Sequence, residues 1–307
     1  MINKIDPKKT TSPSPSDSVG HNATIQVGRI SYLNVDPIYY GLENGLKPPW
    51  VELTAAPPAS LNCLMVEEKL DISPVSTGAY TRHTDQWLIL PNLSISCHGS
   101  VMSVLLASNF PLDDLDGRRV LVTSESGTAV LLLKLIFAMK GIEPHIQSGP
   151  VGDRWKSTDH PDAVMIIGDK ALSGRWEQKY IYLMDLGDMW LQLSGLPIVF
   201  AVWVVQKSFA DRHPARVTEI IDLFRRSTRM GRENMDRIIA HGTDRLNLDR
   251  DRLRTYFNAM QYDLDEKKQQ ALVAFFDGLH EHGLIEWSTR LSFFRPIEGE
   301  QKSTPFV

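Results

Sequence analysis

Apolar runs of strand length alternate along the chain with longer segments that carry apolar residues at helical spacing. Runs rich in β-branched and other apolar residues predict buried strands at residues 24–30, 87–90, 101–107, 119–123, 162–167 and 196–205. Segments bounded by proline or glycine predict helices at residues 37–45, 61–70, 129–140, a short one from Lys170, and 208–284 with interruptions at Gly231, Gly242 and Gly278. Residues 72–78 are too punctuated for a helix and predict a strand end that leads into a loop.

Strands that alternate with helices are typical of an α/β fold with mainly parallel sheets. Residues 119–141 show the pattern most clearly. There an apolar strand is followed by a polar turn at 124–128 and by an apolar helix that ends at Gly141, a residue typical of helix ends. We therefore predict an α/β protein with mainly parallel sheets, and we find no internal repeat of fixed period.

The composition is that of an ordinary globular protein. The chain has 307 residues, of which 42% are hydrophobic and 23% charged, with a net charge of −4; this is enough chain for a large core or two domains. No apolar run approaches the ~20 residues that cross a bilayer. Residues 1–23 lack the apolar segment of a secretory signal, which predicts a disordered tail and a cytoplasmic protein. Cys63 and Cys97 are predicted to be reduced core thiols.

Arginines are dense between residues 225 and 254, a pattern that suggests binding to nucleic acid. Acidic residues are interleaved with them, however, and the whole chain is acidic. A solvated helix face with charge pairs is therefore the favoured interpretation. We expect no nucleic-acid partner.

The usual motifs of cofactor and metal chemistry are absent from the sequence. No His-Glu-x-x-His segment occurs, and His280 and His282 are two residues apart, so they cannot share a helix face. No Gly-x-Gly-x-x-Gly follows a strand, and neither a phosphate loop nor a Gly-x-Ser-x-Gly segment is present. We therefore expect no cofactor and no metal.

Polar loops follow several of the predicted strands, at residues 31–34, 73–77, 124–128 and 168–169. In open α/β sheets, ligands bind beyond the carboxyl ends of the strands. Hydroxyl groups and helix N-terminal N–H groups suit an anionic ligand, above all a carboxylate. Three of these loops also have a purely structural interpretation: Ser124 or Ser126 could cap the following helix, and Asn34 and Asp169 could form an Asx-turn or a helix cap.

The opening segment Gly28-Arg-Ile-Ser-Tyr-Leu-Asn34, followed by Pro37, resembles the first motif of the chorismate dehydratases of the futalosine route to menaquinone. Further similar segments lie in order along the chain at 71–76, 93–96, Gly99, 103–106, 115–117, 123–128, 167–169, 185–187 with Trp190, 195–203, 262–266 and 283–285. The chain departs from the pattern at Thr77-Gly78-Ala79-Tyr80, at Cys97 and in its longer N-terminal tail.

The resemblance implies a type II periplasmic-binding-protein fold, in which two α/β lobes enclose a ligand cleft. Lobe one would hold residues 24–107 and 202–307, and lobe two residues 108–201. The fold alone would suggest a solute-binding protein, but a fold does not fix a function. A noncatalytic binder of aromatic acids therefore remains an alternative, as does the sister enzyme 1,4-dihydroxy-6-naphthoate synthase, whose usual Ser-Pro-Cys-Pro-Asn-Asp-like opening is absent here.

The resemblance also implies a reaction, the loss of water from chorismate to give 3-[(1-carboxyvinyl)oxy]benzoate. The matching segments contain no histidine and supply Asp169 as the candidate carboxylate, so the substrate's own enolpyruvyl carboxylate could remove the ring proton, with Asp169 as the rival base. Asn34, Ser103 and Asp169 are the candidate catalytic residues, although Ser103 could instead be a small inward residue of a buried strand. The candidate substrate-binding residues are Ser31, Tyr32, Ser76, Ser124, Ser126, Thr128 and Gly168.

Overall fold

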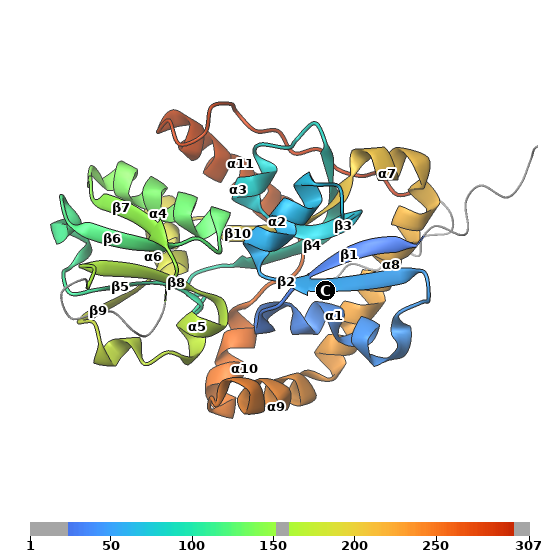
Figure 1. Ribbon diagram of the computed structural model, residues 1–307, viewed down its shortest axis with the longest axis horizontal. Helices are drawn as coiled ribbons and strands as arrows, with labels where there is room; N and C mark the ends of the chain where they lie inside the picture. The colour runs from blue at the N-terminus through green and yellow to red at the C-terminus, as the bar shows by residue number, and fades with distance from the viewer. Residues whose placement is uncertain (1–23, 152–159, 298–307) are drawn as a thin grey trace, which may run out of the picture.

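The computed structural model describes residues 24–151 and 160–297 and contains two five-stranded sheets (Figure 1). The strand order is β2-β1-β3-β10-β4 in the first sheet and β7-β6-β8-β5-β9 in the second. In Figure 1 the second sheet lies at the left and the first sheet to its right. The tail predicted at residues 1–23 lies outside the described residues.

The first sheet is built from the N-terminal part of the chain and one later strand. Its strands are β1 (Ile25–Ile30), β2 (Val51–Ala56), β3 (Ile72–Ser76), β4 (Trp87–Cys97) and β10 (Ile198–Gln206). The helical segments between them are η1 (Leu33–Val35), α1 (Asp36–Gly41), η2 (Leu42–Leu46), α2 (Pro58–Val66) and α3 (Thr77–Tyr80). After β10 come α7 (Lys207–Arg212), α8 (Pro214–Glu233), α9 (Met235–Leu246), α10 (Arg250–Ala259) and α11 (Glu266–Glu281).

The second sheet is built from the middle of the chain. Its strands are β5 (Val104–Ser108), β6 (Arg119–Thr123), β7 (His145–Gly149), β8 (Ala163–Ile167) and β9 (Tyr182–Asp185). Its helical segments are η3 (Leu112–Leu115), α4 (Gly127–Lys140), α5 (Gly168–Ser173), η4 (Trp176–Gln178) and α6 (Leu186–Ser194). The helix predicted at 129–140 is confirmed as α4, and its C-cap Gly141 has a φ of 66°, the left-handed conformation that favours glycine.

The prediction of mainly parallel sheets is wrong, because both sheets are mixed. β1 pairs in parallel with β2 and β3, and β6 with β7 and β8. β10, however, runs antiparallel to both β3 and β4, and β5 runs antiparallel to both β8 and β9. β10 and β5 are continuous apolar runs like the buried parallel strand β8, and burial on both faces gives the same apolar pattern whichever way a strand runs.

The helical interruptions predicted at three glycines are also wrong. Gly231, Gly242 and Gly278 lie inside α8, α9 and α11. At Gly231 a Cβ atom would lie 2.1 Å from the backbone oxygen of Pro37, so this glycine permits close packing of α8 on α1. The helices end instead near Asn234 and at Asn247, which has a φ of 51°.

The two cysteines differ in their surroundings. Cys97, the last residue of β4, is buried, as predicted. The prediction of a core thiol is wrong for Cys63, which is exposed on α2. That helix turns Leu61 and Met65 toward the core instead.

Among the described residues, no helix is long and apolar enough to span a membrane.

Candidate functional site

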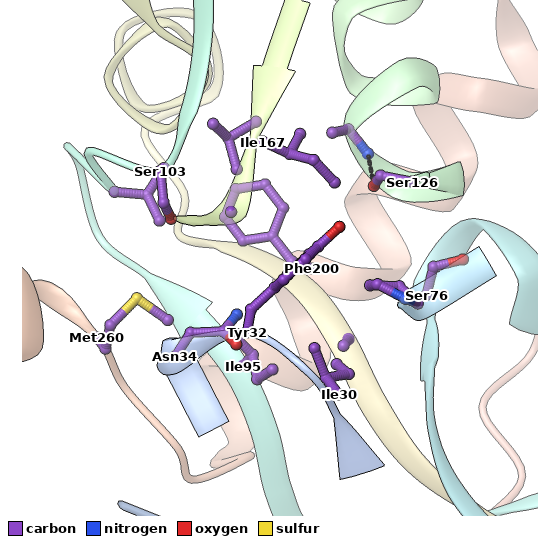
Figure 2. A pocket seen from close by; sticks show the side chains of 16 residues that line it. Ile30, Tyr32, Asn34, Ser76, Ile95, Ser103, Ser126, Ile167, Phe200 and Met260 are labelled. Atoms are coloured by element: carbon purple, nitrogen blue, oxygen red, sulfur yellow. Dashed lines mark hydrogen bonds between the residues drawn. The ribbon is translucent and has the colours of Figure 1, made fainter. Parts of the chain in front are cut away.

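A cavity lies where the two sheets meet (Figure 2). Its volume is about 60 Å³. Its walls come from the first sheet, the second sheet, the start of α4 and the segment after α10. The lining residues are Ile30, Tyr32, Asn34, Pro58, Ser76, Ile95, Val101, Ser103, Val104, Ser126, Ala129, Ile167, Gly168, Phe200, Ala201 and Met260.

The cavity lining is mostly apolar, and the lining residues that the structure describes include no Lys, Arg, His, Asp or Glu. Its polar side chains are the hydroxyls of Tyr32, Ser76, Ser103 and Ser126 and the amide of Asn34. In Figure 2, Ser76 and Ser126 lie on one side of the view, with Ser103 and Asn34 on the other. An apolar wall with a few separated polar groups is typical of a site for a small organic ligand.

Asn34 brings an unpaired polar atom to this cavity. It lies in η1, the short helix that follows β1, because the chain turns sharply there toward α1 and its Pro37. The side-chain Oδ1 is buried and has no hydrogen-bond partner among the described residues. Since buried polar atoms are nearly always paired, the amide is suited to a ligand, and the alternative of a cap formed by this oxygen is not observed.

Ser103 lies just before β5 rather than inside it, because the strand begins at Val104. The Ser103 backbone oxygen accepts a hydrogen bond from the Gly168 backbone N–H at 2.8 Å. Its hydroxyl accepts one from the Tyr256 hydroxyl at 3.3 Å. Ser103 is buried, and its own O–H remains able to donate toward the cavity that it lines.

Ser126 combines the two roles that the sequence left open for it, and Ser76 likewise both caps a helix and lines the cavity. The Ser126 hydroxyl caps α4 by accepting a hydrogen bond from the Ala129 N–H at 3.2 Å (Figure 2), and it also lines the cavity. The Ser76 hydroxyl caps α3 by accepting from the Ala79 N–H at 3.1 Å. Each hydroxyl accepts from the backbone and keeps its own proton for another partner.

Three candidate substrate-binding residues do not line the cavity. Ser124 is exposed, and Ser31 uses its backbone oxygen to accept from Arg245 at 2.6 Å. The Thr128 hydroxyl is buried and donates to the Phe200 backbone oxygen at 2.7 Å. It also accepts from the Gly78 N–H at 3.2 Å, which leaves it little capacity for a ligand.

Asp169 also lies outside the cavity lining. Its Oδ1 accepts from the Leu33 backbone N–H at 3.0 Å, and its Oδ2 forms an ion pair with Arg245 at 2.7 Å. The helix-cap alternative is wrong, because α5 has no side-chain cap and the carboxylate binds the start of η1 instead. Burial raises the pKa of Asp169, against the opposing effects of the Leu33 N–H and Arg245.

The sequence did not predict a role for Glu125, which forms two hydrogen bonds beside the cavity. The Tyr32 hydroxyl donates to Glu125 at 2.6 Å, and Lys170 donates to the other oxygen of that carboxylate at 3.0 Å. These two hydrogen bonds lower the pKa of Glu125 although burial raises it. The Tyr32 ring lies against Gly168, where a Cβ atom would be 2.8 Å from it. Glu125 stands in the polar turn after β6, and its charge among hydroxyl residues was the available signal.

The fold and the cavity define the class of protein. A Candida albicans protein described as having the generic periplasmic binding protein fold superposes with a TM-score of 0.65 at 11% identity, over 90% of this chain and 99% of that one. The molecule is thus a two-lobed α/β protein of periplasmic-binding-protein fold, with a cavity where its two sheets meet.

Sequence comparison identifies the family. Residues 25–281 match the family model for menaquinone biosynthesis, and the chain belongs to that family. It is 28% identical over 271 residues to chorismate dehydratase of Thermus thermophilus, covering 82% of this chain and 94% of that protein. It is 23% identical over 263 residues to 1,4-dihydroxy-6-naphtoate synthase of the same organism, covering 83% and 94%.

Proposed function

We propose that this protein is a chorismate dehydratase, a carbon–oxygen lyase that removes water from chorismate to give 3-[(1-carboxyvinyl)oxy]benzoate in the cytoplasm. The observation that carries the proposal is a mostly apolar cavity, without an ionic side chain in its described lining, that presents the Asn34 amide and the Ser103 hydroxyl. The similarity to the Thermus thermophilus dehydratase supports it.

The reaction needs two bonds to break on neighbouring ring carbons. The C–H bond of the carbon that bears the enolpyruvyl ether breaks, and its electron pair forms the new ring double bond. The C–O bond of the adjacent carbon breaks, and its hydroxyl leaves and takes up the proton as water. The ring becomes aromatic, so the enzyme mainly has to orient the reacting groups.

The substrate's enolpyruvyl carboxylate is the base in this proposal. No cation in the described lining of the cavity would pair with that carboxylate, and an apolar environment raises the pKa of a carboxyl group. A carboxylate of raised pKa is a better proton acceptor. Holding it against the ring in reactive geometry contributes roughly 7–11 kcal/mol toward lowering the barrier.

The protein's part is to hold the substrate. The Asn34 amide has donor and acceptor atoms for the enolpyruvyl carboxylate and the ring hydroxyl, and its Oδ1 has no protein partner among the described residues. The Ser103 O–H would donate to the leaving hydroxyl. Ser126, at the N-terminus of the 14-residue helix α4, would receive the ring carboxylate, because helix N-termini favour anions.

Asp169 is the less favoured base. Its two oxygens already accept from Leu33 and Arg245, and the residue does not line the cavity. A base must come within about 3 Å of the proton that it removes, directly or through one water. In its observed place Asp169 supports η1, and thereby the loop that carries Tyr32 and Asn34.

Incubation of the purified protein with chorismate, followed by chromatography and mass spectrometry, tests the function. We expect loss of 18 mass units and appearance of the enolpyruvyl benzoate. Binding of chorismate without conversion would instead indicate the noncatalytic binder. If the protein neither converts nor binds chorismate, the result would favour the naphthoate synthase, to one member of which the chain is 23% identical. Heat-denatured protein is the control for spontaneous breakdown of chorismate.

A further inference from the structure

The turn that precedes Ser103 has an uncommon backbone conformation. Met102 has a φ of 59°, in the left-handed region that side chains other than those of Gly, Asn and Asp seldom adopt. Such a conformation costs on the order of 1 kcal/mol or more and persists only where its surroundings enforce it. Because Met102 is the immediate neighbour of Ser103, whatever enforces this conformation also fixes the Ser103 Cα–Cβ direction.

Asp185 is the group that enforces it. The carboxylate, at the end of β9, accepts hydrogen bonds from the backbone N–H groups of Val101 at 3.0 Å and Met102 at 2.6 Å. It also accepts one from the Ser100 hydroxyl at 2.9 Å. The same carboxylate caps α6 through the Gly187 N–H at 2.9 Å. A single carboxylate therefore ties the turn at 100–102 to the start of a helix.

Tyr256 holds the Ser103 side chain from the opposite direction. It lies on α10, is 1% exposed, and donates its hydroxyl hydrogen to Ser103 Oγ at 3.3 Å. Burial raises the pKa of the Tyr256 phenol, so it is a protonated donor at neutral pH. Because Tyr256 occupies an acceptor position of Ser103 Oγ, the serine hydrogen is directed to another partner.

We propose that Asp185 and Tyr256 are positioning residues for Ser103: Asp185 fixes the strained turn before it, and Tyr256 orients its hydroxyl hydrogen into the cavity. Neither residue belongs to the cavity lining, so both act through Ser103. The inference rests on the proposed dehydratase function, in which Ser103 donates to the leaving hydroxyl.

The Tyr256→Phe variant tests the hydroxyl contact. We expect kcat to fall about 3- to 10-fold with little change in KM, because one neutral hydrogen bond is lost and the ring remains. In a Ser103→Ala background the same substitution should have no further effect on kcat. Tyr262→Phe is the matched control, since the Tyr262 hydroxyl is buried, has no hydrogen-bond partner among the described residues and lies outside the cavity lining.

The Asp185→Asn variant tests the turn. An asparagine offers one oxygen and directs an NH2 group at backbone donors, so the turn should relax and kcat should fall about 10- to 100-fold. This loss should also vanish in the Ser103→Ala background. Asp265→Asn is the matched control, because Asp265 caps α11 through the Lys268 N–H at 2.9 Å and does not line the cavity.

The outcomes separate this inference from the proposed function. Additive losses in the Ser103→Ala background, or unchanged kcat in both single variants, would overturn the positioning role and leave the dehydratase assignment standing. If wild type fails to convert chorismate, the function is overturned, and crystal structures of wild type and Asp185→Asn then decide the inference. A displaced Ser103 hydroxyl supports it, and an unmoved one refutes it.

Discussion

At the scale of residues, the sequence predicted which side chains lie close together more accurately than it predicted the partner of each side chain. Asn34 and Ser126 follow β1 and β6, Ser103 stands just before β5, and all three line one cavity. Asp169 follows β8 in the same way, but its carboxylate accepts from Leu33 instead of lining that cavity. Position after a strand is readable from apolar patterning, whereas the direction of a side chain depends on partners distant in sequence, such as Arg245.

Substitutions at these residues should rank in a definite order. Under the proposed mechanism Asn34→Leu and Ser103→Ala should each lower turnover by ~10²–10³-fold, because each would remove a hydrogen bond that fixes the reacting geometry. Asp169→Asn should keep measurable turnover, because an asparagine oxygen can still accept from the Leu33 N–H and, in the proposed mechanism, the substrate's own carboxylate takes the proton. Steady-state kinetics on variants with wild-type melting curves measures this ranking. An inactive, folded Asp169→Asn beside active Asn34 and Ser103 variants would identify Asp169 as the base.

At the scale of elements, the clearest strand and helix patterns predicted the right elements, whereas the helix breaks predicted at the glycines are wrong. The strand at 119–123 and the apolar helix after it are observed as β6 and α4. The sequence predicts a helix break at Gly231 because glycine is a poor helix former. Its actual role is steric, and it depends on Pro37, almost two hundred residues away in the chain. Close approach between distant helices leaves no periodic signal in a single sequence.

The two helix glycines Gly231 and Gly278 should therefore respond oppositely to alanine. Gly231→Ala should destabilise the protein by about 1–3 kcal/mol, because the new Cβ would lie 2.1 Å from the Pro37 backbone oxygen and α8 would have to move. Gly278→Ala is the matched control. Its new Cβ would lie 3.3 Å from the flexible side chain of Leu135, so the higher helix propensity of alanine should stabilise the protein by up to ~1 kcal/mol. Denaturant unfolding measures both, and equal effects would contradict the packing role of Gly231.

At the scale of the whole molecule, the resemblance implied two lobes, and the two sheets give that division physical form. The first sheet takes residues 25–97 and 198–206, and the second takes 104–185. The predicted boundaries at 107/108 and 201/202 fall inside β5 and β10, so the lobe limits themselves remain a prediction. Two interactions join the part of the chain around the first sheet to the part around the second. Tyr32 donates a hydrogen bond to Glu125, and Asp169 forms an ion pair with Arg245.

The contact between Tyr32 and Glu125 joins the end of the first sheet to the turn after β6 of the second, so it should favour the closed arrangement around a ligand. Tyr32→Phe keeps the ring that lines the cavity and removes only the hydroxyl. Glu125→Ala removes the acceptor. Each variant should raise KM about 5- to 10-fold. This is the effect expected for the loss of one charge-assisted hydrogen bond whose strength is reduced by the partial exposure of Glu125. The double variant should be no worse than either single one.

The same contact sets an expectation for pH. The folded pKa of Glu125 lies below its ordinary value, so the stabilisation that it provides is complete above about pH 4.3, the unfolded pKa, and is lost as the pH falls through the lower folded value. Between pH 6 and 9 the KM ratio of variant to wild type should therefore be constant. Glu67→Ala, at an exposed ion pair with Lys69, is the control and should leave KM unchanged. Additive effects of Tyr32→Phe and Glu125→Ala would show that the two side chains act independently. A KM ratio that varies between pH 6 and 9 would contradict the expected pH dependence.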